Sequence, residues 1–354
     1  MPRRSRRRPR LPAVRPIELE PPRRVLIVKP SALGDVVHAL PVAALLKRRW
    51  PAAHLSWLVS RPFAPLLEAN PHVDETIPFD RGRGAGLVRQ SGVARRLARD
   101  LRRRGFDLVI DLQGLLRSGW LAWQTGAPVR VGFAYAREAA ALFYTHRVTA
   151  RPGERHAVER YLDVAELLGL GRVPVEFPLV TTPEDEQQVQ SLLAPLDGEP
   201  FAVLLPGTNW ATKRWPAERF AELAIMLERQ RGLRIVIAGG GDASEAAGIV
   251  RSKLPSALDL SGRTGIRQLV ALLKTASLAV TNDSGPMHIA AALGTPLVSL
   301  FGPTSPSRTG PYGRAGSVVR LEIPCSPCYS RRCSHQSCLR LLPAAQVLER
   351  CVDG

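Results

Sequence analysis

The sequence predicts an α/β protein made of two doubly wound domains in tandem, which face one another across a cleft. The chain has 354 residues, more than one hydrophobic core usually organises, and 45% of them are hydrophobic. From position 24 onward, short β-branched runs alternate with helical stretches, as in parallel sheets covered by helices. A proline-rich stretch of low helical promise, 169–186, divides this alternation into two halves.

Each half supplies four strand candidates. For the first sheet they are 24–29, 55–59, 107–112 and 129–133, and for the second they are 201–205, 234–238, 278–281 and 296–301. Doubly wound sheets bind ligands at the carboxyl ends of their strands, so we expect two such edges to face each other across the cleft. That geometry suits a reaction that joins two different substrates.

The expected division of the chain has four parts. A basic tail (1–22) precedes an N-terminal domain (23–172), a C-terminal domain (173–342) and a short amphipathic helix (343–354). The tail is rich in Pro and Arg and has no apolar periodicity, so we expect it to be disordered. We expect the last helix to pack back on the N-terminal domain and tie the two halves together.

Two segments account for most of the formal charge of +18, which arises from 49 basic and 31 acidic residues. Residues 1–24 hold nine Arg and two Glu, and residues 81–104 hold nine Arg and one Asp. The first segment suits a solubilising tail or contact with an anionic membrane, and it lacks the interleaved aromatic residues of nucleic-acid arms.

The second basic segment predicts a helix with an apolar stripe of Val93, Leu97 and Leu101. Its basic face is either solvated or docks phosphate or lipid. No run approaches the roughly 18 uninterrupted apolar residues of a membrane-spanning helix, and the N-terminus lacks the apolar core of a signal peptide. We therefore expect a cytoplasmic protein.

The segment 281–303 is typical of a phosphate site, because a polar turn opens a helix of small residues that runs into an apolar strand. Asp283 or Ser284 can cap this helix, Gly285 lets a ligand approach the backbone, and Pro286 suits the first turn. The unpaired amides at the helix start would face an anion.

Two further loops of the second half follow strands. The first, 205–216, combines Gly207, Thr208 and Lys213 and can wrap a pyrophosphate, with the Lys213 ammonium facing a leaving diphosphate. In the second, Gly240 and Gly241 allow a nucleotide to approach the main chain, and Asp242 or Glu245 could accept ribose hydroxyls. The spacing is not that of the dinucleotide fingerprint, and the glycines alone could simply form a turn.

In the first half, Asp35 falls near the start of a helix that follows a strand. An Asp there either caps the helix or acts as a catalytic base, and its place at a strand's carboxyl end favours catalysis. His38 lies one helical turn further on, and either orients Asp35 or an incoming hydroxyl, or packs as a structural histidine.

Four cysteines occur within fourteen residues: Cys325, Cys328, Cys333 and Cys338. The spacing suggests a structural zinc site of four thiolates, although the intervals are short for a zinc ribbon. Disulfides and free thiols remain alternatives, and a cytosol disfavours disulfides.

The chain beyond the tail resembles the ADP-heptose:lipopolysaccharide heptosyltransferases, glycosyltransferase family 9, and within it the enzyme that adds the first inner-core heptose. These enzymes have the GT-B architecture of two Rossmann-like doubly wound domains. The resemblance rests on KPSALGD, DLQGLLRS, AREAAALFYTHR, HAVERY, LPGTNWATKRWP and TNDSGPMHIAAALGTPLVSLFGPTSP. The cysteine segment departs from the first-heptose type and resembles other branches of the family.

The resemblance implies a role for each matching residue. Asp35 would be the general base, and the ADP-sugar would be bound by Gly207, Thr208, Lys213, Gly240, Gly241, Glu245, Asp283, Ser284, Gly285 and His288. The acidic Kdo sugars of a lipid A acceptor would face a first-domain rim of Lys29, Ser31, Arg61, Gln113, Arg117 and Arg137. His288 would lie near the donor heptose, or else merely pack.

The implied reaction is a direct displacement with inversion, in which Asp35 takes the acceptor's proton while ADP departs against Lys213 and the helix dipole. No cofactor is expected to be required, because no D-x-D pattern is present to hold a metal and diphosphate together. The expected partners are ADP-heptose, an acidic lipid-linked acceptor and the inner face of the cytoplasmic membrane. The alternatives are another nucleotide-sugar enzyme, such as a non-hydrolysing epimerase, and a basic nucleic-acid-binding protein.

Overall fold

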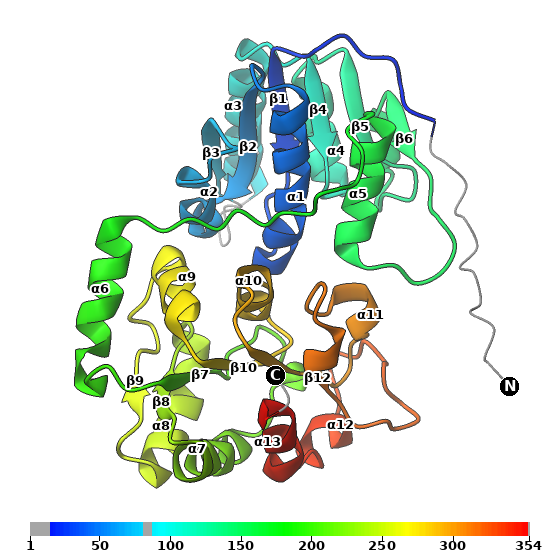
Figure 1. The fold of residues 1–354 in the computed structure, drawn as a ribbon. Coiled ribbons are helices and arrows are strands. Elements are labelled where there is room, and N and C mark those ends of the chain that lie inside the picture. Colours follow the sequence, from blue (N-terminus) through cyan, green and yellow to red (C-terminus); the bar gives the residue numbers. More distant parts are fainter. Residues whose placement is uncertain (1–14, 81–86, 353–354) are drawn as a thin grey trace, which may run out of the picture.

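The computed structural model describes residues 15–80 and 87–352, which form two α/β domains stacked one above the other (Figure 1). Each domain is built on a six-stranded sheet whose strands all run parallel. The first sheet has the order β3-β2-β1-β4-β5-β6 and the second has the order β12-β11-β10-β7-β8-β9. When its strands are counted within the domain, the second order is the same as the first, and it is the Rossmann order.

The elements of the first domain are β1 (Arg24–Val28), α1 (Leu33–Arg49), β2 (His54–Ser60), η1 (Arg61–Phe63), α2 (Pro65–Glu68), β3 (Glu75–Phe79), α3 (Leu87–Arg103), β4 (Leu108–Asp111), α4 (Leu116–Gln124), β5 (Val129–Phe133), η2 (Ala140–Phe143), β6 (His146–Val148) and α5 (Ala157–Leu167). Helices α1 and α5 cover one face of the sheet, and α3 and α4 cover the other (Figure 1).

The elements of the second domain are α6 (Pro183–Leu193), η3 (Ala194–Leu196), β7 (Phe201–Leu205), η4 (Ala211–Lys213), α7 (Ala217–Arg231), β8 (Arg234–Ile237), η5 (Gly241–Ala243), α8 (Ser244–Lys253), β9 (Leu258–Asp259), α9 (Ile266–Thr275), β10 (Leu278–Asn282), α10 (Gly285–Leu293), β11 (Leu297–Leu300), α11 (Pro306–Thr309), η6 (Ala315–Ser317), β12 (Val318–Val319), α12 (Ser337–Arg340) and α13 (Ala344–Val352). Helices α9 and α10 lie on the side that faces the first domain (Figure 1).

All eight strands expected from the sequence are present, with ends that differ by at most one residue. The four strands that were missed are β3, β6, β9 and β12, and each lies at an edge of its sheet. Two of them have only two residues, and β3 contains Pro78. Edge strands are not enclosed on both sides, so they lack the continuous apolar run that marks a central parallel strand.

The hydrophobic core continues from one domain into the other. One cluster joins Val36 and Leu40 of α1, in the first domain, to Met287 of α10 and Leu269 of α9, in the second. Separate clusters fill the far face of each sheet, under α3 and α4 in the first domain and under α7, α8 and α13 in the second. The two domains therefore meet through packed apolar side chains as well as through polar contacts.

The structure corrects two expectations about the ends of the chain. Residues 1–14 of the expected disordered tail lie outside the described residues, but residues 15–22 are placed on the first domain. The Ile17 amide donates to the Leu167 carbonyl at 2.9 Å, and Ile17 and Leu19 pack on the core. The expectation of disorder is wrong for residues 15–22, because the apolar side chains of Ile17 and Leu19 pack on the core of the first domain.

Helix α13 packs on α7 and β11 of the second domain, so the expectation that it returns to the N-terminal domain is wrong. Its apolar side chains, Ala344, Val347, Leu348 and Cys351, are buried in the core below the second sheet. The amphipathic pattern of the segment is visible in the sequence, but it does not specify which surface the apolar face of the helix covers.

The basic helix α3 partly follows its expected pattern. Leu101 is fully buried and Leu97 packs beside it, whereas Val93 is 41% exposed and does not continue the stripe. Residues 81–86, the start of the basic segment, lie outside the described part of the chain. No helix among the described residues has the length and apolar character needed to cross a bilayer.

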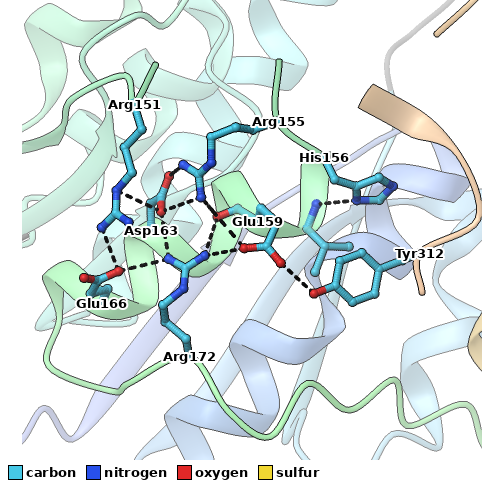
Figure 2. Close-up of polar contacts among 9 residues, drawn as sticks. Arg151, Arg155, His156, Glu159, Asp163, Glu166, Arg172 and Tyr312 are labelled. Carbon is cyan, nitrogen blue, oxygen red and sulfur yellow. Dashed lines mark hydrogen bonds and ion pairs between the residues drawn. The ribbon is translucent and has the colours of Figure 1, made fainter. Parts of the chain in front are cut away.

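The stretch 168–182 contains no helix or strand and runs between α5 and α6, from one domain to the other (Figure 1). A network of charges fixes its beginning (Figure 2). The buried Asp163 carboxylate on α5 contacts three guanidinium groups, those of Arg151, Arg155 and Arg172. Arg172, which lies in the connecting stretch, also pairs with Glu166 at 2.9 Å.

The same network reaches the second domain. The Tyr312 hydroxyl donates to Glu159 at 2.7 Å, and Glu159 also pairs with Arg172 (Figure 2). Beside it, the Glu154 carboxylate accepts bonds from Ser305 at 2.8 Å and from Tyr329 at 3.2 Å. One segment of the first domain, 154–159, therefore holds the loops around 305–329 of the second.

We predict that Asp163→Ala lowers the free energy of unfolding by about 3–5 kcal/mol, because it leaves three arginines clustered without their shared buried carboxylate. Urea denaturation measures this change. The matched control is Glu222→Ala, which removes an exposed partner of Arg219 and should cost under about 1 kcal/mol. Equal losses in the two variants would show that the network does not stabilise the joint.

Candidate functional site

The starts of α1 and α10 meet where the two domains face each other. A β-carbon added to Gly34 on α1 would lie 2.2 Å from the His288 Cδ2 on α10, and one added to Gly285 would lie 2.8 Å from the Leu33 side chain. Only glycine permits so close an approach. Each helix follows the carboxyl end of a central strand, β1 or β10, so the expected meeting of these two sheet edges is present.

Three imidazoles lie behind this contact. The His38 Nε2 is 2.9 Å from the His288 Nδ1, and the rings of His38 and His156 are 4.9 Å apart. His156 is a neutral ring with the proton on Nε2, because Nε2 donates to the Gly310 carbonyl while Nδ1 accepts from the Val158 amide. Burial lowers the pKa of all three imidazoles, and that of His288 to about 4.

Asp35 lies in the first turn of α1, with its side chain 38% exposed. Its Oδ2 accepts from the Ala32 amide at 3.1 Å and lies 3.8 Å from the Lys29 Nζ, and its Oδ1 is 3.4 Å from the Tyr161 hydroxyl. The Asp35 carboxylate thus accepts a hydrogen bond at the start of α1 and is still partly exposed to solvent. The two interpretations of this residue, helix capping and catalysis, are compatible.

Lys29 and its neighbours follow the carboxyl ends of β1 and β4. Burial lowers the pKa of the Lys29 ammonium, while the nearby carboxylates of Asp35 and Asp111 oppose the shift. Asp111 shapes the adjoining loop by accepting from the Gln113 and Gly114 amides at 2.8 and 3.1 Å.

Four of the six expected acceptor residues come together here. The Ser31 amide lies 3.4 Å from the Gln113 Oε1, and the Arg137 amide donates to the Gly114 carbonyl. The charge of Arg137 also contributes to lowering the pKa of Lys29, so the two side chains are near each other. The remaining two are exposed: Arg117 lies in the first turn of α4, and Arg61 pairs with Asp80 at 2.9 Å.

The expected phosphate-binding residues gather at the start of α10. The Lys213 Nζ lies 2.6 Å from the buried Asp283 carboxylate, which also accepts from the Thr304 hydroxyl at 2.5 Å. The Thr208 hydroxyl is 3.5 Å from the Asp283 carbonyl. The buried Ser284 Oγ has no hydrogen-bond partner among the described residues and does not cap the helix. An ammonium, a free hydroxyl and unpaired amides thus share one location.

The glycine loop after β8 lies next to this group. A β-carbon on Gly207 would approach the Asp242 carboxylate to 2.8 Å, so the loops after β7 and β8 are in contact. Gly240 and Gly241 are exposed beside Asp242, and Glu245 is exposed in the first turn of α8. Both carboxylates considered for ribose binding are on this side of the domain, and Asp242 is the one that touches the Gly207 loop.

Several residues of the site were not singled out from the sequence. Tyr161 and Arg160 of α5 lie beside the expected acceptor residues, where Arg160 interacts electrostatically with Lys29 and Tyr161 with Asp35. His156 joins the imidazole cluster, and Thr304 fixes Asp283. Three of these four belong to the HAVERY segment, so the signal was present as a motif, but no spacing rule connects it to Asp35.

The four clustered cysteines line one cavity of about 360 Å³ together with His335. All of them are free thiols. No group of three or more His, Cys, Asp or Glu side chains in the described chain is arranged to hold a metal ion. The zinc expectation stays a prediction that metal analysis of the purified chain can decide.

Comparison with known proteins gives consistent matches. A model described as glycosyltransferase family 9 (heptosyltransferase) matches residues 94–339. Lipopolysaccharide heptosyltransferase 1 of Pseudomonas aeruginosa is 36% identical over 320 residues, which cover 88% of each chain. The solved structure of E. coli heptosyltransferase WaaC with ADP has a TM-score of 0.76 at 28% identity, covering 93% of this chain and 99% of that one.

The same enzyme solved with ADP-2-deoxy-2-fluoro heptose has a TM-score of 0.73 at 27% identity, again covering 93% of this chain and 99% of that one. The GT-B architecture expected from the sequence is therefore confirmed.

The lowered pKa values of the three histidines predict that the protein loses stability in acid. An unfolded histidine has a pKa near 6.5, whereas that of His288 is about 4 in the folded chain, so the unfolded state binds more protons between these two values. We expect the free energy of unfolding to fall as the pH drops from 6.5 towards 4. In His288→Asn the slope should be shallower by about 1 kcal/mol per pH unit. Parallel curves for the two proteins in urea titrations would contradict this.

Proposed function

The chain belongs to glycosyltransferase family 9, the heptosyltransferase family, and from this membership we propose that it moves a heptose from ADP-heptose to an acidic, lipid-linked acceptor of the inner-core lipopolysaccharide. The acceptor would be of the Kdo-lipid A type, as expected for an enzyme that resembles the first-heptose transferase. One observation supports the proposal: where α1 and α10 meet, the His288 ring interacts electrostatically with Asp35 of the first domain and with Asp283 and Lys213 at the start of α10.

The donor side suits an ADP-sugar. The start of α10 offers unpaired amides, the Ser284 hydroxyl and, through Asp283, the Lys213 ammonium. A diphosphate that binds there would take over the Lys213 ammonium from the Asp283 carboxylate. The relative solved with ADP and with an ADP-heptose analogue supports the choice of nucleotide.

The acceptor side suits an anion. Lys29 lies beside Asp35 and is within electrostatic range of Arg137 and Arg160, and Arg117 lies in the first turn of α4. Carboxylate-bearing sugars would pair with these cations, which gives the rim its selectivity. We propose that the protein acts at the inner face of the cytoplasmic membrane, where such an acceptor would be anchored.

The proposed reaction is a single displacement. The acceptor hydroxyl loses its proton to the Asp35 carboxylate as its oxygen forms a bond to the anomeric carbon. The bond from that carbon to the diphosphate oxygen breaks on the opposite side, so the configuration inverts. ADP leaves with the electron pair towards Lys213 and the start of α10. Lys29 and Tyr161 hold the carboxylate in place, and no metal takes part.

The direct test is to incubate the protein with ADP-heptose and Kdo-lipid A and to measure the product mass. A gain of one heptose, unaffected by EDTA, is the expected result. Calorimetry with ADP, UDP and short RNA separates the alternatives: UDP binding without ADP binding indicates another nucleotide-sugar enzyme. Steeply salt-dependent RNA binding alone indicates a nucleic-acid-binding protein.

We predict that Asp35→Asn lowers kcat by about 10²–10⁴-fold and leaves the affinity for ADP unchanged. The amide oxygen can still accept from the Ala32 amide, so the helix start is kept and only the base is lost. Asp185→Asn is the matched control, because Asp185 accepts from the Thr182 amide at the same helical position of α6. If both variants remain active, Asp35 is a capping residue and not the base.

We predict that Lys213→Ala weakens ADP binding by about ten- to a hundredfold, because one charge-assisted bond contributes roughly 1.5–3 kcal/mol. Calorimetry with ADP measures the effect. Lys274→Ala is the control, because the Lys274 Nζ pairs with the Glu186 carboxylate, at 3.9 Å, and not with the groups at the start of α10. Unchanged ADP affinity in Lys213→Ala would remove Lys213 from the donor site.

A further inference from the structure

Exposed apolar side chains occur on α4 and η2 of the first domain. Leu116 and Trp123 of α4 are 48% and 50% exposed, and Leu142 of η2 is 76% exposed. Leu116 and Trp123 are seven residues apart and so lie on the same face of α4. We call these three side chains the α4 face.

The α4 face is held together by tight packing. A β-carbon on Gly119 would lie 2.9 Å from the Ala140 carbonyl oxygen and 3.0 Å from the Phe143 ring, so α4 and η2 are as close as their backbones allow. The rings of Trp123 and Phe143 are 6.2 Å apart. Large apolar side chains that share one exposed surface are typical of an interaction site.

Cations surround this surface. Arg117 is exposed next to Leu116, and the Arg130 Nε donates to the Phe143 carbonyl at 2.9 Å. Helix α3 packs against α4 on the same face of the sheet and exposes Arg96, Arg99 and Arg103 (Figure 1). Two acidic side chains nearby already have partners. Glu138 accepts a hydrogen bond from the Leu116 amide, and Asp100 pairs with Arg104.

We propose that the α4 face and the basic surface of α3 dock the protein on a bilayer that contains anionic phospholipid. The aliphatic and indole side chains would enter the acyl boundary, and the arginines would contact the lipid phosphates. A second copy of the chain fits less well, because two proteins with a formal charge of +18 repel each other. Nucleic acid fits less well because two of the three side chains of the α4 face, Leu116 and Leu142, are aliphatic and offer no stacking surface.

The position of this surface relative to the site supports the assignment, and this step rests on the proposed function. Helix α4 begins three residues after Gln113, beside Arg117 and the acceptor rim. A lipid-linked acceptor could therefore keep its acyl chains in the bilayer under the α4 face while its sugars reach Lys29 and Asp35. The docking surface and the acceptor rim would be parts of one path.

The test is sedimentation with vesicles of phosphatidylcholine, alone or mixed with phosphatidylglycerol. The protein should bind the mixed vesicles and bind less as salt is raised. Trp123→Ser/Leu142→Ser should lower the partition coefficient by more than about tenfold, because two side chains that would be buried in the bilayer are lost. Arg96→Gln/Arg99→Gln/Arg103→Gln should abolish the preference for the anionic lipid. The matched control is Val173→Ser/Leu341→Ser, which removes two exposed apolar side chains elsewhere and should change nothing.

Equal binding by the parent and by the Trp123→Ser/Leu142→Ser variant would overturn the proposal. So would RNA binding without vesicle binding, or a dimer in sedimentation that this variant converts to a monomer. Transfer to a deacylated Kdo acceptor, measured on the same variants, keeps the two proposals separate. Vesicle binding without transfer refutes the enzymatic function alone, and transfer without vesicle binding refutes the docking surface alone.

Discussion

The contact between the starts of α1 and α10 is the constraint on which the rest of the site depends. Gly34 and Gly285 have no side chains, so the His288 ring and the Leu33 side chain can fill the space where their β-carbons would be. Each helix follows a central strand of its own sheet. The approach therefore brings the Asp35 carboxylate of one domain close to the start of α10 of the other, where we propose that phosphate binds. The His38 Nε2 and the His288 Nδ1 meet beside this contact.

Charge is distributed according to the same geometry. Inside the site, the buried Lys29 and the half-buried Lys213 each lie beside a carboxylate, that of Asp35 or of Asp283. At the joint, Asp163 gathers three arginines. Buried ion pairs add little net stability, but they fix the positions of the groups that form them. A ligand that carries phosphate or carboxylate would then enter a site whose cations are already in place.

The first domain presents two different faces. Helices α1 and α5 turn towards the second domain, and they carry Asp35, the buried His38 and Tyr161. On the other face, α3 and α4 expose arginines and three large apolar side chains. Gln113 follows β4 and Arg117 lies in the first turn of α4, and both belong to the proposed acceptor site. The chain's excess of positive charge is thus concentrated in the domain that would receive an anionic, lipid-linked molecule.

The sequence alone determined the two-domain α/β architecture, the eight central strands and the polar turn that opens α10, because these depend on local periodicity and on glycine and polar residues close together in the chain. The edge strands, the ordered residues 15–22 and the destination of α13 were decided by tertiary structure, since each is stabilised by a surface supplied from elsewhere. The same holds for the Asp35–Tyr161 and His38–His288 contacts, which join residues 126 and 250 positions apart. Local patterns specify what a segment can form, and only packing specifies which segments meet.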